Sequence, residues 1–176
     1  MDVLITGANR GIGKALFKAF ASKPNHTVIA GVRDLDTPQA DFAAAMETLK
    51  SQHGIEKLDL VIANAGISKY FGKASITPVQ QMLDHFTANA VGPLLLFPTT
   101  SSLLSTSIAP KFVTISSSAG SIGGMDKLPV ENTAYGSSKI ALNFIARRIY
   151  FENLHLIAFS INPGWLQTDV CSWAIT

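Results

Sequence analysis

The chain has little charge and a single cysteine, and each shortage excludes a class of protein. Lys, Arg, Asp and Glu make up 15% of the 176 residues, against about 25% in typical soluble domains, so the high charge of a disordered chain is absent. Cys171 alone cannot form a disulfide framework or a thiolate metal site, which favours a reducing compartment. The four histidines lack metal-ligand spacing, so we predict no metal and expect surface or helix-end positions for His26, His53, His85 and His155.

Long apolar runs and basic clusters are also missing. No apolar stretch approaches the roughly 20 residues that span a bilayer, and an early acidic residue followed by a glycine-rich loop is not typical of a signal peptide. The formal net charge is +2, with no run of Lys or Arg, so nothing indicates a nucleic-acid surface. We therefore expect a cytoplasmic protein that has neither a membrane nor a nucleic acid as its partner.

The sequence does contain many apolar residues, 47% of the chain, arranged in short runs that alternate with helical patterns. The length suits one domain, residues 1–176. Strands are expected at 3–5, 27–32, 58–63, 111–116 and 156–162, and helices at 12–22, 38–53, 134–153 and from 77 onward. This alternation predicts the α/β class with a doubly wound parallel sheet, Rossmann-like and abbreviated to about five strands.

The predicted helix that begins near residue 77 has the clearest start signal. Thr77 and Gln80 have the spacing of a capping box, and Pro78 suits the first helical position. The apolar residues that follow at helical spacing are expected to line its buried face: Val79, Met82, Leu83, Phe86 and Ala90.

A glycine-rich loop, Thr6-Gly7-Ala8-Asn9-Arg10-Gly11-Ile12-Gly13, lies between the first predicted strand and helix. Gly7 permits a tight turn, Gly11 lets backbone amides approach a pyrophosphate, and Gly13 permits close helix–strand packing. The helix N-terminus adds partial positive charge for the phosphates. The pattern predicts a dinucleotide-binding site, with an ordinary glycine-rich turn as the alternative.

The end of the second predicted strand, Val32-Arg33-Asp34, bears on the choice of dinucleotide. An NAD site normally has a carboxylate there for the ribose 2′-hydroxyl, whereas a 2′-phosphate needs a cation. Val32 cannot supply the acid, and Arg33 with Arg10 could clamp a phosphate. These residues favour NADP(H), although Asp34 is a competing acid and either arginine could be a solvated surface charge.

Tyr135 and Lys139 are four residues apart on a predicted helix, so their side chains share one face. An ammonium beside a phenol favours the phenolate and lowers the tyrosine pKa, as a general acid requires. The alternative is a surface tyrosine beside a solvated lysine. Further polar and glycine residues follow the predicted strands, at the edge where open α/β sheets bind ligands: Ser116, Ser117, Ser118, Asn64, Ala65, Gly66, Pro163, Gly164 and Thr168.

From Thr6 to Thr168, the order and placement of these motifs resemble the classical short-chain dehydrogenase/reductase superfamily. The loop is closest to that of NADPH-using members. The whole chain is similar to fungal polyketide ketoreductases, which serve secondary metabolism, and to sniffer-like carbonyl reductases. The resemblance implies an oxidoreductase that binds NADP(H) and reduces a small-molecule carbonyl compound.

The resemblance also implies a role for each matching residue. Tyr135 would be the acid–base, Lys139 would lower its pKa and bind the nicotinamide ribose, and Asn89 would position a water in the proton relay. Ser117 would hold the substrate oxygen, with Ser116 and Ser118 as alternatives. The implied cofactor-binding residues are Gly7, Asn9, Arg10, Gly11, Ile12, Gly13, Arg33, Asn64, Ala65, Gly66, Tyr135, Lys139, Pro163, Gly164 and Thr168.

Two departures from the family pattern bear on this interpretation. Only 24 residues separate Arg33 from Leu58, which leaves no room for the family's third strand and its acidic residue. The second strand should then be a sheet edge. Only eight residues follow Thr168, where the family continues with a substrate-covering region and a last strand. Phe159 and Ile161 should therefore be uncovered, which favours self-association as a homo-oligomer, with a different partner or a partially unstable fragment as alternatives.

The implied reaction is hydride transfer to a carbonyl carbon as Tyr135 protonates the oxygen and Ser117 stabilises the alkoxide. Two alternatives remain open: non-redox chemistry such as dehydration, isomerisation or cyclisation, and an inactive family member that acts by binding. A hydrophobic, flat substrate fits the aromatic and apolar residues near the predicted pocket, which could equally be ordinary packing residues: Tyr70, Phe71, Met125, Leu128, Pro129 and Trp165.

Overall fold

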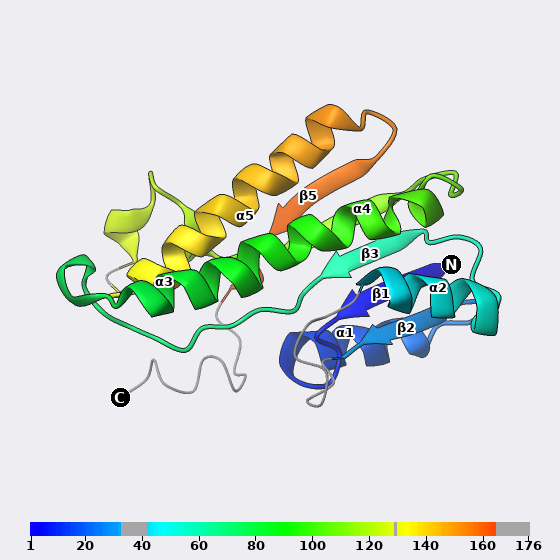
Figure 1. The fold of residues 1–176 in the computed structure, drawn as a ribbon, viewed down its shortest axis with the longest axis horizontal. Coiled ribbons are helices and arrows are strands. Elements are labelled where there is room, and N and C mark those ends of the chain that lie inside the picture. The colour runs from blue at the N-terminus through cyan, green and yellow to red at the C-terminus, as the bar shows by residue number, and fades with distance from the viewer. Residues whose placement is uncertain (33–41, 129, 165–176) are drawn as a thin grey trace.

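The structure, a computed structural model, describes residues 1–32, 42–128 and 130–164 (Figure 1). It contains one parallel sheet with the strand order β2-β1-β3-β4-β5. The strands are β1 (Asp2–Thr6), β2 (Thr27–Gly31), β3 (Leu60–Ala63), β4 (Lys111–Ile115) and β5 (Ile157–Ile161). The helices are α1 (Gly11–Ala21), α2 (Phe42–His53), α3 (Val79–Phe86), α4 (Gly92–Leu104) and α5 (Thr133–Glu152).

The sheet confirms the predicted doubly wound topology. All four strand pairings are parallel, and β1 lies between β2 and β3. Rossmann folds commonly have the order 3-2-1-4-5-6, so the sheet corresponds to that order without the strand outside β2. Within the described ranges β2 is therefore an edge strand, as the short interval after Arg33 predicts.

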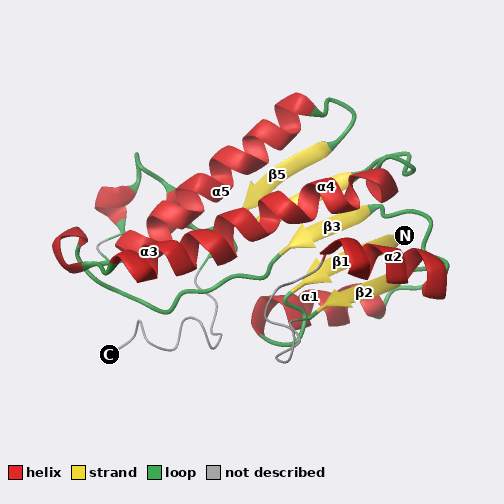
Figure 2. Ribbon diagram, in the orientation of Figure 1, coloured by secondary structure: helices red, strands yellow, loops and turns green. Residues whose placement is uncertain are grey.

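Two apolar clusters hold helices against opposite faces of the sheet. On one face, β1, β3 and β4 pack against Leu16, Phe17 and Phe20 of α1. On the other face, the same strands pack against Met46 of α2, Leu96 of α4 and neighbouring apolar residues of α5. Figure 2 shows α4 between α2 and α5 over this second face. No helix in the described ranges is long and apolar enough to cross a bilayer.

The long helix expected from Thr77 differs from the prediction in its start, its continuity and its buried face. The N-cap position belongs to Pro78, while the Thr77 hydroxyl donates to the Lys73 carbonyl at 2.8 Å, so the capping box is not formed. A π-helical turn, Thr87–Val91, then separates α3 from α4, where Pro93 lies in the first turn and lacks an amide proton.

The predicted buried face of this helix is correct only in part, since Ala90 is buried and Met82 and Phe86 are half-buried. Val79 and Leu83, predicted to be buried, are 73% and 55% exposed. His85 and Asn89 are fully buried instead, because their side chains hydrogen-bond the main chain of the segment that follows β3. Part of the surface that this helix packs on is thus polar main chain, and a hydrophobic pattern cannot identify the residues that contact it.

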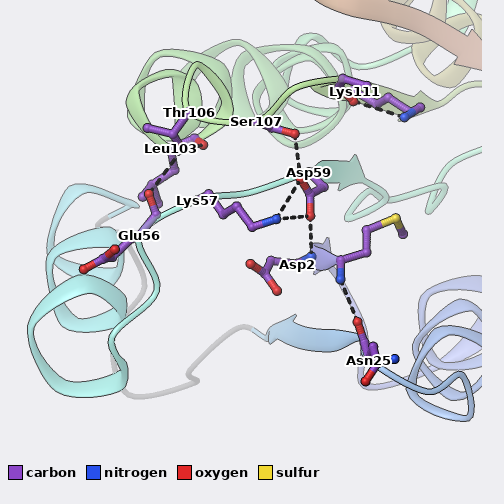
Figure 3. Close-up of polar contacts among 11 residues, drawn as sticks. Asp2, Asn25, Glu56, Lys57, Asp59, Leu103, Thr106, Ser107 and Lys111 are labelled. Atoms are coloured by element: carbon purple, nitrogen blue, oxygen red, sulfur yellow. Dashed lines mark hydrogen bonds and ion pairs between the residues drawn. The ribbon is translucent and has the colours of Figure 1, made fainter.

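The sheet has an amino edge, where its parallel strands begin, and a carboxyl edge, where they end, and the two edges carry different side chains. At the amino edge, the Asp59 carboxylate accepts hydrogen bonds from the Asp2 amide at 2.9 Å, the Ser107 hydroxyl at 2.6 Å and the Lys57 ammonium at 3.0 Å (Figure 3). Burial alone would raise the pKa of this carboxyl, but these hydrogen bonds and the Lys57 charge outweigh burial and lower the pKa to about 2. The carboxyl edge carries the loops described next.

Candidate active site

The glycine-rich loop turns from β1 into α1 in the way its sequence predicts. Gly7 and Gly11 have φ angles of +68° and +52°, which favour glycine. A Cβ on Gly13 would lie 2.2 Å from the Gly7 carbonyl oxygen, so α1 approaches the loop too closely for any side chain. Arg10 is the N-cap residue of α1 and gives its first turn no side-chain hydrogen bond. Helix amides at such an end need acceptors from outside the helix, which suits a phosphate.

Asn64 connects this loop to the end of β3. Its side-chain amide donates to the Thr6 carbonyl at 2.9 Å and to the Gly7 carbonyl at 3.3 Å. The Thr6 hydroxyl in turn accepts from the Asn64 and Ala65 amides at 3.0 and 3.1 Å. Sequence reasoning assigned no role to Thr6, although this threonine opens the loop motif. These bonds leave Ala65 and Gly66 exposed beside the glycine-rich loop.

The structure brings Tyr135 and Lys139 together on α5. The Lys139 Nζ lies 5.6 Å from the centroid of the Tyr135 ring and donates to the Ile115 carbonyl at 2.8 Å. Lys139 is only 5% exposed, and this burial lowers the pKa of its ammonium to about 8. A cation is therefore held next to a half-buried phenol, at the carboxyl end of β4.

The three consecutive serines after β4 have three different environments. Ser116 is 5% exposed, and its hydroxyl has no hydrogen-bond partner among the described residues. Ser117 is half-buried and its hydroxyl accepts from the Ala119 amide at 3.2 Å, which caps a 3-10 turn (Ser118–Gly120). Ser118 is exposed. Of the three, Ser117 combines a fixed backbone with partial access to solvent.

Asn89 lies within the π-helical turn and is fully buried. Its Oδ1 accepts from the Ile67 amide at 2.8 Å, and its Nδ2 donates to the Ile67 carbonyl and to the Ser138 hydroxyl, both at 2.9 Å. Ser138 donates to the Tyr135 carbonyl at 2.7 Å. A Cβ on Gly66 would lie 2.8 Å from Asn89 Oδ1 and 3.7 Å from Lys139 Nζ. The Asn89 side chain thus joins the loop after β3 to the helix that bears Tyr135.

The end of β5 supplies the last described part of this edge. Gly164 has a φ angle of +75°, and its amide donates to Asn162 Oδ1 at 3.1 Å, while Pro163 is half-buried. The predicted residues Arg33, Pro129, Trp165 and Thr168 lie outside the described residues. The described ranges contain no group of His, Cys, Asp and Glu side chains that could hold a metal ion.

His85 was predicted at the surface or a helix end, and it lies in the last turn of α3, but it is buried rather than solvated. The side chain is fully buried, its Nε2 is 3.1 Å from the Lys69 amide, and its Nδ1 is 2.7 Å from the Gln81 carbonyl. The signal that could have identified it is its spacing of four residues from Asn89, which puts both polar side chains on one helical face.

The geometry assembles a defined set of chemical groups along one edge. It offers amide donors for an anion at the glycine-rich loop, exposed backbone at Gly66, and a phenol with an adjacent cation. Such an edge is where open α/β sheets bind ligands.

Residues 29–173 match the short chain dehydrogenase family. The chain is 37% identical over 193 positions to the norsolorinic acid ketoreductase of Aspergillus parasiticus, covering 95% of this chain and 71% of the relative. It is 35% identical over 194 positions to that of Emericella nidulans, covering 95% and 73%. Since these alignments exceed the 176 residues of the chain, the relatives carry residues within the matched region that this chain lacks.

Solved structures share the fold. An NADPH-bound carbonyl reductase from chicken fatty liver has a TM-score of 0.86 at 26% identity, covering 96% of this chain and 81% of that one. The carbonyl reductase Sniffer of D. melanogaster has a TM-score of 0.84 at 23% identity, with 98% and 84% covered, which shows likeness of fold alone. From the matched family and the identity to these relatives, the chain belongs to the short-chain dehydrogenase family.

Proposed function

We propose that this protein reduces a carbonyl compound to an alcohol with NADPH as the hydride donor. The observation that carries the proposal is the Tyr135–Lys139 pair, in which a buried ammonium lies 5.6 Å from the centre of the phenol ring. An acid of this kind is what carbonyl reduction requires of the protein. The relatives named as ketoreductases and carbonyl reductases support the same reaction.

The residues that would hold NADPH fit such a group. The close approach of Gly13 to Gly7, the positive φ angles of the loop and the exposed backbone at Ala65 and Gly66 mean that the carboxyl edge presents main chain rather than bulky side chains to a dinucleotide. Arg10 is exposed at the start of α1, and β2 ends at Gly31 without a carboxylate before Arg33. The NADPH in the chicken carbonyl reductase supports the phosphorylated dinucleotide.

When bound, the cofactor supplies the hydride that adds to the carbonyl carbon. Tyr135 gives its phenolic proton to the carbonyl oxygen, so new C–H and O–H bonds replace the carbonyl π bond. Lys139 stabilises the phenolate that remains on Tyr135. Ser117 donates a hydrogen bond to the oxygen as negative charge develops there. The chain therefore positions the substrate and supplies one proton.

The proposed substrate is a flat, hydrophobic carbonyl compound. The relatives act, by name, on norsolorinic acid. In this chain Phe71 is 40% exposed, and the neighbouring Tyr70 donates its hydroxyl proton to the Ile76 carbonyl at 3.2 Å, which fixes the ring. An exposed ring next to a fixed one suits stacking on an aromatic ketone.

NADPH titration followed by its fluorescence tests the proposal. We expect saturable binding of NADPH, stronger than that of NADH, and oxidation of bound NADPH when an aryl ketone or quinone is added. Replacing Arg10 and Arg33 together by Ala should weaken NADPH far more than NADH. Conversion of substrate at a rate that does not depend on added NADPH would instead indicate non-redox chemistry. Binding of neither NADPH nor substrate would indicate an inactive family member.

The outer face of α4 and α5 supports a homodimer. A groove of about 480 Å³ lies between these helices, and its borders include Leu95 and Phe144, which are 52% and 67% exposed. Arg148 and Glu152 form an ion pair beside it. Because this surface carries both signs of charge next to apolar groups, a second copy related by a two-fold axis can present each charge to its opposite. We take that second copy as the occupant of the groove.

A further inference from the structure

We propose that His85 is a positioning residue that fixes the substrate side of the active-site rim. The segment that His85 holds is Asn64–Gly72, here called the strap, which runs as an extended loop from the end of β3 toward α3 (Figure 1). The inference rests on the proposed carbonyl reduction, because it assigns the strap's far half to substrate binding.

The hydrogen bonds of His85 define its chemical state. A backbone amide can only donate and a backbone carbonyl can only accept, so Nε2 accepts from Lys69 and Nδ1 carries the proton that it donates to Gln81. The imidazole is therefore neutral, and both nitrogens are used. Full burial of the ring means that no water can replace either partner cheaply.

The strap has separate attachments along its length. Its first half is held by the Asn64–Thr6 bonds and by the two bonds between Ile67 and Asn89. Its end is held at Gly72, whose amide donates to the Glu131 carbonyl at 2.7 Å and whose carbonyl accepts from the Thr133 hydroxyl at 3.0 Å. Between these points, the hydrogen bond from the Lys69 amide to His85 holds the strap's main chain against α3.

These attachments link the strap to the catalytic helix at both ends. Gly66 lies beside the Lys139 ammonium, and Thr133 lies two residues before Tyr135 on α5. Tyr70 and Phe71, which follow Lys69 directly, are the proposed aromatic surface for the substrate. Loss of the His85 bond should therefore displace these rings while Asn89 and Thr6 keep the cofactor half in position. These rings would bind the substrate equally in the ground state and the transition state, so their displacement should raise KM and leave kcat nearly unchanged.

Two substitutions separate the two bonds of His85. In His85→Gln, the longer side chain carries an oxygen near the place of Nε2 and can still accept from the Lys69 amide. In His85→Asn, the shorter side chain retains a donor near the place of Nδ1 for Gln81 but cannot reach the strap. We expect His85→Asn to raise KM for the carbonyl substrate about tenfold, with kcat and the NADPH Kd changed less than about twofold. In His85→Gln, KM should stay close to the wild-type value.

Hydrogen exchange at the strap gives a readout that needs no turnover. The amide of Lys69 should exchange at least about tenfold faster in His85→Asn than in His85→Gln, since only the former lacks its acceptor. If a His85 variant does not fold, a pair of substitutions at Lys69 on the strap tests the same hydrogen bond. Lys69→Pro removes the amide donor, whereas Lys69→Ala retains it and alters only an exposed side chain.

Each outcome decides the matter. Faster exchange with an unchanged KM would confirm the attachment and overturn its role in substrate binding. Equal exchange of the Lys69 amide together with equal KM in the two His85 variants, or equal KM in the two Lys69 variants, would overturn the inference altogether. If wild-type protein reduces no carbonyl compound, the proposed function fails by itself, whereas the exchange result still reports whether His85 holds the strap.

Discussion

At the scale of the residue, the buried ammonium of Lys139 is the group whose chemistry most constrains the proposed reaction. Burial opposes the charged form, and the hydrogen bond that the ammonium donates to the Ile115 carbonyl offsets part of that cost. A lysine held this way next to Tyr135 is close to losing its proton at moderately alkaline pH. The proposed reaction thus depends on a charge that burial of Lys139 disfavours.

The pH dependence of activity follows from that burial. The pKa of Lys139 is lowered from 10.5 to about 8, so the ammonium is charged below pH 8 and neutral above it. We expect kcat/KM for carbonyl reduction to fall as pH rises through about 8, because a neutral amine no longer stabilises the Tyr135 phenolate. Steady-state kinetics between pH 6 and 10 measure this, and a flat profile would contradict it. Over the same range unfolding should become less favourable, since the unfolded chain binds the proton more tightly.

Gly13 offers a second test at the residue scale. Its substitution by Ala would put a Cβ 2.2 Å from the Gly7 carbonyl oxygen and 2.5 Å from Asn64 Nδ2. We expect Gly13→Ala to lose about 1–3 kcal/mol of stability by overpacking and to weaken NADPH at least tenfold, about 1.4 kcal/mol.

Gly123→Ala is the matched control for this substitution. Gly123 is exposed, and a Cβ there meets nothing within 4 Å. Thermal unfolding and NADPH titration of both variants give the comparison. Equal effects of the two substitutions would mean that the close approach of α1 to the loop is not what matters.

At the scale of the element, hydrophobic pattern and motif placement predicted most of the frame. The five strands, α1 and α5 were predicted to within a few residues, because buried parallel strands read as continuous apolar runs and α1 has one apolar face. The same signal failed for α3, where Val79 and Leu83 are exposed and His85 is buried. Hydropathy records apolar burial, and it cannot register a helix that packs through hydrogen bonds to a loop.

The candidate site also contains features that the sequence predicted and features that it could not predict. The four-residue spacing predicted that Tyr135 and Lys139 meet, because both lie on one helix. The glycine pattern predicted the loop between β1 and α1, because a single turn contains all of its residues. The links between elements, such as Asn89 to Ile67 and Thr6 to Asn64, depend on the tertiary arrangement of segments far apart in sequence. No local pattern specifies them.

Asp59 gives a prediction for the amino edge, where it joins β1, β3 and the loop before β4. Its pKa is lowered from 3.8 to about 2, so the stabilisation of roughly 2 kcal/mol is present above pH 4 and lost as pH falls toward 2. Asp59→Asn should lower the free energy of unfolding at pH 7 by a comparable amount, and the difference from wild type should shrink below pH 4. Urea unfolding at several pH values measures this, with the exposed Asp126→Asn as control. A difference that does not depend on pH would contradict the assignment.

At the scale of the whole molecule, the described residues include exposed apolar side chains on β5 and along the α4–α5 groove. On β5, Ile157, Phe159 and Ile161 are 48%, 44% and 39% exposed, as the sequence predicts for the last two. The other region is the α4–α5 groove that we assign to a second copy. Contiguous apolar surface of this kind marks interaction sites in soluble proteins.

The dimer proposal makes a prediction for solution behaviour. Phe144→Glu should convert a dimer into a monomer without changing secondary structure, because the residue is 67% exposed in the single chain. Ile108→Glu, at a fully exposed position of the loop before β4, should leave the assembly unchanged. Sedimentation velocity measures both. A monomeric wild type, or a dimer that survives Phe144→Glu, would contradict the assignment of the groove.

The central claim is that Tyr135 protonates a carbonyl oxygen while NADPH is oxidised. Single-turnover oxidation of bound NADPH by an aryl ketone, compared between wild type and Tyr135→Phe, tests it most directly. The account predicts a loss of at least about 100-fold in rate, with the Kd for NADPH changed less than about twofold and an alcohol as the wild-type product. Undiminished reduction by Tyr135→Phe, or substrate conversion by wild type with no NADPH consumed, would contradict it.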